Sequence, residues 1–93
     1  MVNGDDSPRI KRILEWQTRY DVLLERLRTA GEREWVGILL DAPAGAATGT
    51  EAMAQTNQTL AELHDTNVAG RLGLQETITD LLQRWREVTT AID

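Results

Sequence analysis

The stretch GEREWVGILLDAPAGAATGTE, residues 31–51, joins two amphipathic segments and decides how the chain can fold. It opens on a glycine, the residue found most often in the left-handed conformation that ends a helix. Glu32 and Glu34 suit the N-terminal end of a helix dipole, and Pro43 cannot continue a helix. Four apolar residues lie at helical spacing: Trp35, Ile38, Leu39 and Ala42. The stretch therefore predicts a short helix at residues 32–41.

The tract that follows this short helix, residues 43–50, contains two glycines and no bulky side chain. Such a composition is typical of a flexible linker, so we expect a short apolar helix on a tether. Two roles are open for this helix. It either closes the open side of a helical bundle, or docks reversibly and yields its groove to a partner helix.

The segment before Gly31 predicts a helix at residues 8–30. Ser7 suits the N-cap, Pro8 suits the first helical position, and Gly31 suits the C-terminal end. Steps of three and four residues draw one apolar stripe along it: Ile13, Trp16, Tyr20, Leu23, Leu27 and Ala30. Most of its other positions are charged, which indicates a solvated outer face.

The C-terminal segment predicts a second strong helix at residues 71–92. Its apolar residues follow the steps of a coiled-coil seam: Leu74, Ile78, Leu81, Trp85, Val88 and Ile92. Residues 51–69 have a helical period but few large apolar side chains: Met53, Leu60, Leu63 and Val68. This middle helix is therefore expected to be weakly held.

The junction between the middle and last helices is ambiguous. Gly70 and Gly73 each disfavour a helix interior by roughly 1 kcal/mol relative to alanine, and Gly70 also suits a C-cap after Ala69. However, the heptad steps run through the junction, and no serine, aspartate or asparagine follows Gly70 to start a new helix. We therefore expect one continuous or kinked helix here.

These elements predict an all-α protein, an antiparallel helical hairpin or three-helix bundle with a short extra helix. The length of 93 residues fits a single domain, residues 1–93. The chain has no cysteine, which excludes disulfides and thiolate sites and fits a reducing cytoplasm. Asp5 and Asp6 argue against a secretion leader, and no apolar run is long enough to span a membrane. A homodimer is compatible with this pattern.

The net charge of −5 is concentrated in the middle of the chain. Residues 32–70 hold one basic and six acidic side chains, whereas residues 1–31 hold six basic and five acidic ones. A nucleic-acid-binding protein needs a net basic face, so this distribution argues against nucleic acid as a partner.

The residues that catalysis requires are sparse. His64 is the only histidine and Ser7 the only serine, and neither belongs to a set of nucleophile, base and orienting group. Glu62, His64 and Asp65 are too close in sequence to converge on a metal from one helix. The sequence thus predicts no enzyme, no metal and no cofactor.

Two stretches, LERLRTAGEREWVGILL (24–40) and LAELHDTNVAGRL (60–72), resemble the small flagellar type III export chaperones of the FlgN and FliT type. The tract at residues 44–50 departs from that group, whose second helix is long and uninterrupted. The resemblance implies a cytoplasmic helical chaperone or adaptor that masks an amphipathic helix of a secretion substrate.

A second resemblance rests on Trp35-Val36-Gly37, which is similar to the Trp-x-Gly turn of small type VII secreted helical hairpins. Here the C-terminal Tyr-x-x-x-acidic signal of that family has no match, because Thr89 stands four residues after Trp85. This resemblance implies a secreted protein instead, and a structural or assembly subunit is the other alternative.

Partner-binding residues are expected on two elements. The middle helix lacks the bulk to cover the last helix, so that stripe would be exposed to a protein partner, and the short helix would act as a gate beside it. The expected partner-binding residues are Trp35, Leu39, Leu74, Ile78, Leu81 and Trp85.

Overall fold

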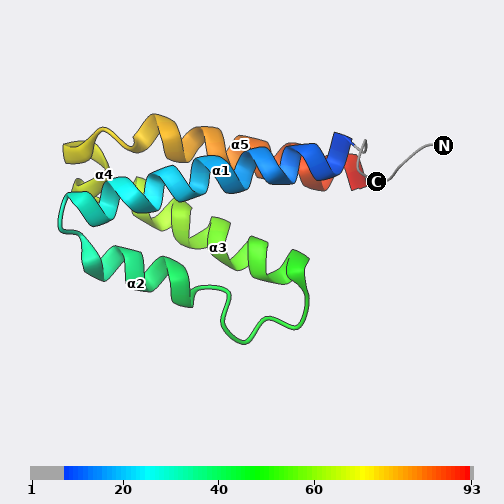
Figure 1. The fold of residues 1–93 in the computed structure, drawn as a ribbon, viewed down its shortest axis with the longest axis horizontal. Helices are drawn as coiled ribbons and strands as arrows, with labels where there is room; N and C mark the ends of the chain where they lie inside the picture. Colours follow the sequence, from blue (N-terminus) through cyan, green and yellow to red (C-terminus); the bar gives the residue numbers. More distant parts are fainter. Residues whose placement is uncertain (1–7, 93) are drawn as a thin grey trace.

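The computed structural model describes residues 8–92 of the chain, with side chains from 10 to 88. The described residues form five helices and no strand, which confirms the all-α prediction (Figure 1). The helices are α1 (Pro8–Thr29), α2 (Arg33–Asp41), α3 (Gly49–His64), α4 (Asn67–Leu72) and α5 (Gln75–Ile92). Pro8 opens α1 as expected, and the predicted Ser7 cap lies outside the described residues.

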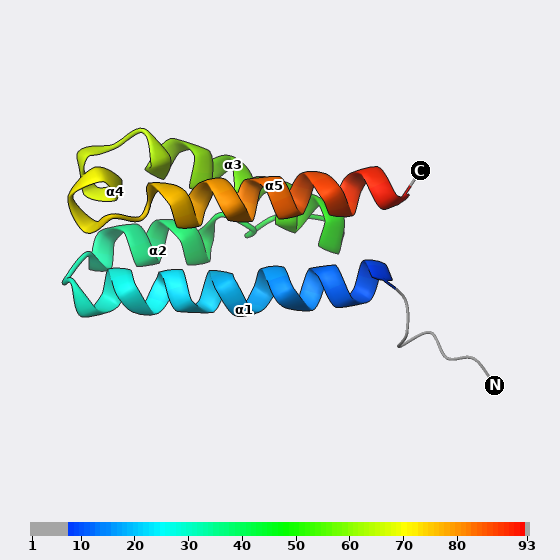
Figure 2. The ribbon, with the colours of Figure 1, turned by 90° about the horizontal axis from the view of Figure 1, so that it is seen from above.

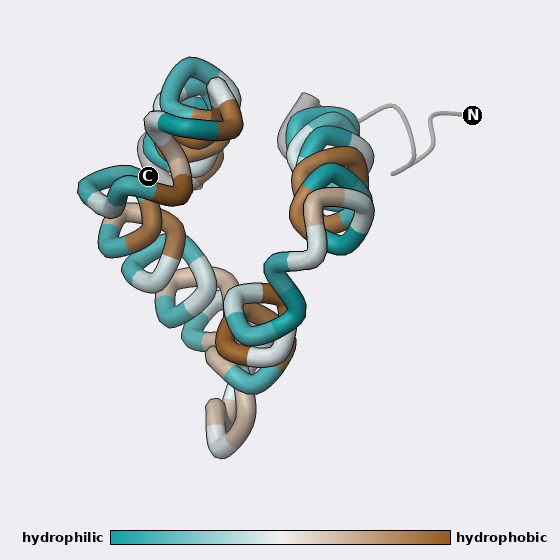
Figure 3. Tube along the Cα trace, turned by 90° about the vertical axis from the view of Figure 1, so that its left-hand side faces the viewer, coloured by the Kyte–Doolittle hydropathy of each residue, from teal (hydrophilic) through white to brown (hydrophobic). Residues whose placement is uncertain are grey.

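Four of the helices form a ring. α1 packs against α5 and α2, and α3 packs against the same two helices, so α1 and α3 lie diagonally across the ring. α1 and α3 run in one direction and α2 and α5 in the other (Figures 1 and 2). Seen along the long axis, the helices surround a common interior (Figure 3). The fold is thus an all-α bundle in which α1, α5, α3 and the short α2 surround the core, and α4 connects α3 to α5.

The interior of the ring is one apolar cluster. Every helix or its flanking turn contributes to it: Trp16, Tyr20, Leu23, Leu24 and Leu27 of α1, Val36 and Leu39 of α2, Leu60 and Leu63 of α3, Ala69 of α4, Leu74 before α5, and Ile78 and Leu81 within it. The expected stripe of the first helix therefore faces inward except at Ala30, which is exposed. The expected stripe of the last helix does so from Leu74 to Val88, and the side chain of Ile92 lies outside those that the structure describes.

The fourth side of the ring is only half covered by a helix. α2 has nine residues and lies beside the half of α1 nearest the Gly31 turn (Figures 1 and 2). Farther along α1, the rings of Trp16 and Tyr20 stack with centroids 4.8 Å apart. The Trp16 indole Nε1 also donates a hydrogen bond of 3.3 Å to Oδ1 of Asn57 on α3. Where α2 is absent, an aromatic pair and a buried amide thus close the interior.

Two glycine turns end α1 and α4 with the same hydrogen-bond pattern. Gly31 has φ +83°, and the Glu32 N–H donates to the Leu27 carbonyl at 2.9 Å. Gly73 has φ +68°, and the Leu74 N–H donates to the Ala69 carbonyl at 2.9 Å. Both are Schellman motifs, in which the left-handed glycine lets the following N–H reach back over the last turn.

The expected continuous helix from the middle segment into the last one is wrong. α3 ends at His64, α4 spans only Asn67–Leu72, and Gly73 rather than Gly70 ends it. The first break falls at Asp65 and Thr66, where the Thr66 hydroxyl donates to the Leu63 carbonyl at 2.7 Å. This side chain satisfies a backbone group at the end of α3, so the chain can turn away there.

Candidate functional site

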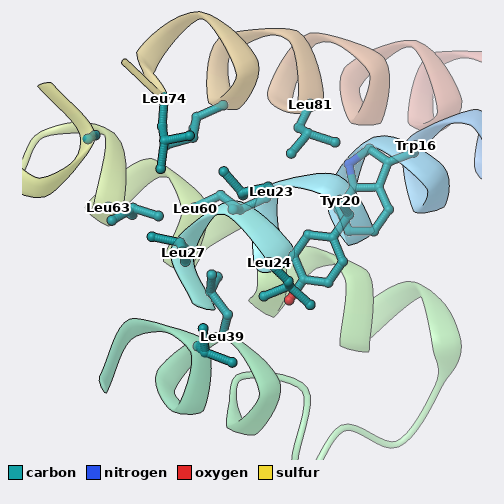
Figure 4. Close-up of a cluster of buried hydrophobic side chains, with 13 residues drawn as sticks. Trp16, Tyr20, Leu23, Leu24, Leu27, Leu39, Leu60, Leu63, Leu74 and Leu81 are labelled. Atoms are coloured by element: carbon teal, nitrogen blue, oxygen red, sulfur yellow. The ribbon is translucent and has the colours of Figure 1, made fainter. Parts of the chain in front are cut away.

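α2 is the short helix for which the sequence leaves two roles open, as a fixed part of the bundle or as a segment that docks reversibly. Leu39 is fully buried and Val36 nearly so, while Trp35 is partly buried against the core. Leu39 points from α2 toward the leucines that α1 and α3 contribute to the interior (Figure 4). The prediction of a short helix at residues 32–41 is confirmed, and this helix packs against both α1 and α3.

The N-terminal end of α2 is held by the glycine turn and by one surface ion pair. No side chain caps this end of the helix. The carboxylate of Glu32 instead pairs with the guanidinium of Arg71, which comes from α4. Solvent-exposed pairs contribute about 0–1 kcal/mol, so this contact orients α2 more than it anchors it.

The C-terminal end of α2 leads into residues 42–48, which form a run of tight turns. Backbone N–H groups of Ala42, Ala44 and Ala46 each donate to the carbonyl three residues earlier, at 3.0–3.3 Å. Gly45 has φ +87°, a conformation that favours glycine. Four of these seven residues are exposed, the other three are partly buried, and no side chain is larger than proline or threonine. The connection therefore adds little packing to α2.

α3 begins with a side-chain cap, two residues before the predicted start. The Thr48 hydroxyl accepts a hydrogen bond of 3.1 Å from the Glu51 N–H, and the Glu51 carboxylate accepts one of 2.8 Å from the Ala47 N–H. The Thr-x-x-Glu spacing of Thr48 and Glu51 signals such a start. This cap fixes the far end of the 42–48 connection.

The residues predicted to bind a partner do not form an exposed face. Leu74, Ile78 and Leu81 are fully buried, and Trp85 is partly buried against the core. The expectation of an open stripe on the last helix is therefore wrong, because α1 and α3 both pack on α5 and α2 closes the opposite side. Leu39 lies in the same cluster as these residues. A role for them in partner binding stays a prediction, and it requires the ring to open.

The tripeptide Trp35-Val36-Gly37 lies inside α2 and is not a turn. The turn between the first two helices is at Gly31, four residues before Trp35. A Cβ built on Gly37 meets no atom within 4 Å, so no close contact requires glycine there.

His64 lies in a groove on the outside of α3 and α5. Its Nδ1 is 3.1 Å from a carboxylate oxygen of Asp65, and the groove has a volume of about 690 Å³. Arg12 and Glu87 also line it. Among residues 10–88, no group of three or more histidine, aspartate or glutamate side chains is arranged to hold a metal ion.

The buried polar centre around Trp16 was not predicted from the sequence. Asn57 is buried, its Nδ2 donates to the Met53 carbonyl at 2.7 Å, and its Oδ1 accepts from Trp16. Burial, with a smaller contribution from the charge of Asp21, raises the pKa of the Tyr20 hydroxyl to about 12. The sequence signal was the presence of two adjacent polar residues, Thr56 and Asn57, on the helix face that Met53, Leu60 and Leu63 line.

A second feature missed by the sequence interpretation is an apolar stripe on the outside of α1. Ile10, Leu14 and Val22 are all exposed, although they belong to the helix with the largest buried face. Their spacing in steps of four, through Thr18, could have revealed it, because such steps stay near one face of a helix.

No helix within residues 8–92 combines the length and the apolar character needed to cross a lipid bilayer. Comparison of the chain with protein-family models, curated proteins and solved structures gives no match.

Proposed function

We propose that this chain is a non-enzymatic adaptor that binds an amphipathic helix of a protein partner in the place that α2 occupies. The observation that carries the proposal is that few buried side chains hold α2 against the rest of the bundle. It is a nine-residue helix whose buried contacts rest mainly on Val36 and Leu39, and a connection of small residues joins it to α3. A longer amphipathic helix could make more apolar contacts with the surfaces of α1 and α3 that α2 covers.

The energies involved favour exchange over permanent docking. Burying a valine or leucine side chain stabilises by about 1.5–3 kcal/mol, so two such residues hold α2 by only a few kcal/mol. The ordering of α2 and its connection offsets part of this gain. A partner helix whose apolar contacts exceed those of α2 therefore displaces it at moderate concentration.

The predicted partner-binding residues have a defined role in this proposal. Once α2 leaves, the groove walls are Leu27 of α1 and Leu60 and Leu63 of α3. Leu74, Ile78 and Leu81 form the floor behind them, because they belong to the same cluster as Leu39. Trp35 leaves with α2 and reports the exchange, while Trp85 borders the floor. A partner helix with apolar residues three or four positions apart would cover these surfaces.

The class of partner is supported by the resemblance to flagellar export chaperones of the FlgN and FliT type. Such a chaperone would mask the amphipathic terminal helix of a secretion substrate in the cytoplasm, and the absence of cysteine fits that reducing compartment. Binding rather than catalysis is also supported by the lone His64, whose carboxylate neighbour Asp65 is mostly exposed.

The test uses a fluorescent peptide with the sequence of residues 32–42, added to the full chain and followed by anisotropy. Leu39→Ala weakens the docking of the chain's own α2, since removing a buried leucine side chain costs about 2–5 kcal/mol. Peptide affinity should then rise at least about tenfold. Leu40→Ala, at an exposed leucine of the same helix, should leave the affinity unchanged.

Circular dichroism checks that Leu39→Ala remains folded, and Val36→Ala provides a milder version of the same change. If both variants remain helical and bind the peptide no better than the unmodified chain, α2 is a fixed part of the core and the proposal fails. The natural partner would then be sought by capture from the native host and mass spectrometry, with Leu39→Ala as the bait of higher affinity.

A further inference from the structure

An apolar stripe runs along the outside of α1, away from the core. We use the name outer stripe for Ile10, Leu14, Thr18 and Val22. The three apolar members are 43%, 61% and 53% exposed, respectively, and they account for most of the large exposed hydrophobic residues in the described part of the chain. Apolar groups gathered on one face of a single helix mark an interaction surface more strongly than scattered ones.

The middle of the outer stripe carries no charge and no unsatisfied side chain. The Thr18 hydroxyl donates to the Leu14 carbonyl at 3.0 Å, so its hydrogen-bonding need is met within α1. Of the two acidic residues nearest Thr18, Glu15 pairs with Arg84 at 3.4 Å, and Asp21 accepts a hydrogen bond from Gln17 at 3.1 Å. A second helix that approaches Thr18 therefore meets Glu15 already in an ion pair, and it meets Asp21 as a charged carboxylate whose hydrogen-bond partner is the amide of Gln17.

A hollow also lies beside the stripe. Thr18 and Val22 line a groove of about 580 Å³ between α1 and α5, and Val22 borders another of about 420 Å³ that reaches Leu72. Four of the seven residues that line the first groove are charged, so an apolar side chain placed opposite Val22 would find its room in the second groove, beside Ala30 and Leu72. This combination of a ridge and a neighbouring hollow is what helix packing requires.

We infer that the occupant is α1 of a second copy of this chain, packed antiparallel with a two-fold axis at Thr18. In that arrangement Leu14 of each copy lies opposite Val22 of the other, since both stand four residues from Thr18. A two-fold interface repeats every contact, so the two apolar pairs form together around a central pair of threonines.

The charges on α1 select this orientation. Lys11 and Glu25 are both exposed and both stand seven residues from Thr18, on opposite sides of it. Antiparallel pairing places each Lys11 against a Glu25 of the other copy. Parallel pairing would place like charges together at both positions, which is unfavourable. The same register sets Glu15 opposite Asp21, two acidic residues that each stand three positions from Thr18, so the complementarity is not complete. Parallel pairing would set every charged residue of α1 against its own copy, so the antiparallel orientation is the more favourable of the two.

The experiment measures self-association of the full chain by sedimentation equilibrium over a wide concentration range. The unmodified chain should dimerise, and Leu14→Glu should weaken the association at least about tenfold, because the change is made twice in a two-fold interface. Leu40→Glu is the matched control, since Leu40 on α2 is 54% exposed and lies outside the outer stripe. It should leave association unchanged.

A charge exchange tests the register. Lys11→Glu and Glu25→Lys should each weaken the dimer, and the double variant should restore it. A chain that stays monomeric throughout, or a dimer that Leu14→Glu does not weaken, overturns the inference, and so does a double variant that fails to recover. None of these results depends on displacement of α2, so this inference can fail while the proposed function stands.

Discussion

The indole of Trp16 and the amide of Asn57, 41 residues apart in sequence, are joined by a buried hydrogen bond of 3.3 Å across the diagonal of the helix ring. α1 and α3 do not form one of the main helix pairs of the bundle, whose contacts run through α2 and α5. This hydrogen bond therefore connects two helices that would otherwise meet mainly through leucines. Both polar side chains are satisfied by it, because the Asn57 Nδ2 is already bonded to the Met53 carbonyl.

Replacing Asn57 measures how much this hydrogen bond contributes to the stability of the fold. Asn57→Ala leaves the buried Trp16 N–H without an acceptor, so we expect a loss of about 1–3 kcal/mol in the free energy of unfolding, measured with urea. Gln58→Ala is the control, because Gln58 is the exposed neighbour on the same helix. Equal, small effects of the two substitutions would mean that water replaces the lost amide.

Because of Tyr20, the free energy of unfolding should decrease as the pH rises above 10. Its pKa is raised to about 12 in the folded chain, mainly by burial, whereas an unfolded tyrosine ionises near pH 10. Below pH 10 the stabilisation is fully present. Between pH 10 and 12 the unfolded chain loses the proton while the folded chain keeps it, so stability should fall by about 1.4 kcal/mol per pH unit.

The control for this titration is Tyr20→Phe, which should remove that part of the alkaline loss. Tyr20 is the only tyrosine, so the absorbance of tyrosinate reports its ionisation directly. Ionisation near pH 10 in the folded chain would contradict the burial argument.

A pair of glycine substitutions separates two backbone roles. Gly73→Ala places a Cβ at φ +68°, which should destabilise the fold by roughly 1–2 kcal/mol. Gly70→Ala, inside α4, should stabilise it by about 0.5–1 kcal/mol, because alanine favours a helix interior. A Cβ at either position meets no atom within 4 Å, so the contrast is purely conformational. Thermal unfolding measures both, and destabilisation by Gly70→Ala would show that α4 is not helical in solution.

The connection between α2 and α3 offers a test of the gate that leaves the core untouched. Inserting seven Gly/Ser residues between Gly45 and Ala46 doubles the connection at residues 42–48 and preserves the Thr48 cap. Doubling a loop costs only about 0.6 kcal/mol, so the melting temperature should change little while the affinity for the 32–42 peptide rises about threefold. An unchanged affinity with a lower melting temperature would assign the connection a structural role.

Local signals in the sequence were sufficient for the first half of the fold. Gly31 and Pro43 act on their own backbone, so they set the ends of α1 and α2 without help from distant residues. The break after His64 was not predicted, because Gly70 and Gly73 are the residues of this segment that most disfavour a helix. The turn-forming residues Asp65, Thr66 and Asn67 lie before both glycines, and they set the boundary.

Periodicity identified the inward face of α5 but not what covers it. Leu74, Ile78 and Leu81 were correctly placed on one stripe, yet that pattern is the same for a core and for an exposed groove. The cover comes from α1, α3 and α2 together, which is a property of the assembled ring. The same reasoning explains why Asn57 was not singled out, since its partner Trp16 becomes its neighbour only after folding.

Both glycine turns lie at one end of the bundle, while the first turn of α1 and the last turn of α5 lie together at the other (Figures 1 and 2). A pulling force applied between Pro8 and Ile92 would therefore separate α1 from α5 one helical turn at a time. The same force applied between Thr29 and Ile92 would load the whole contact between these helices at once. The force needed to unfold the molecule should thus depend on the direction of pulling. It should be lowest when the force is applied to the first turn of α1 and the last turn of α5.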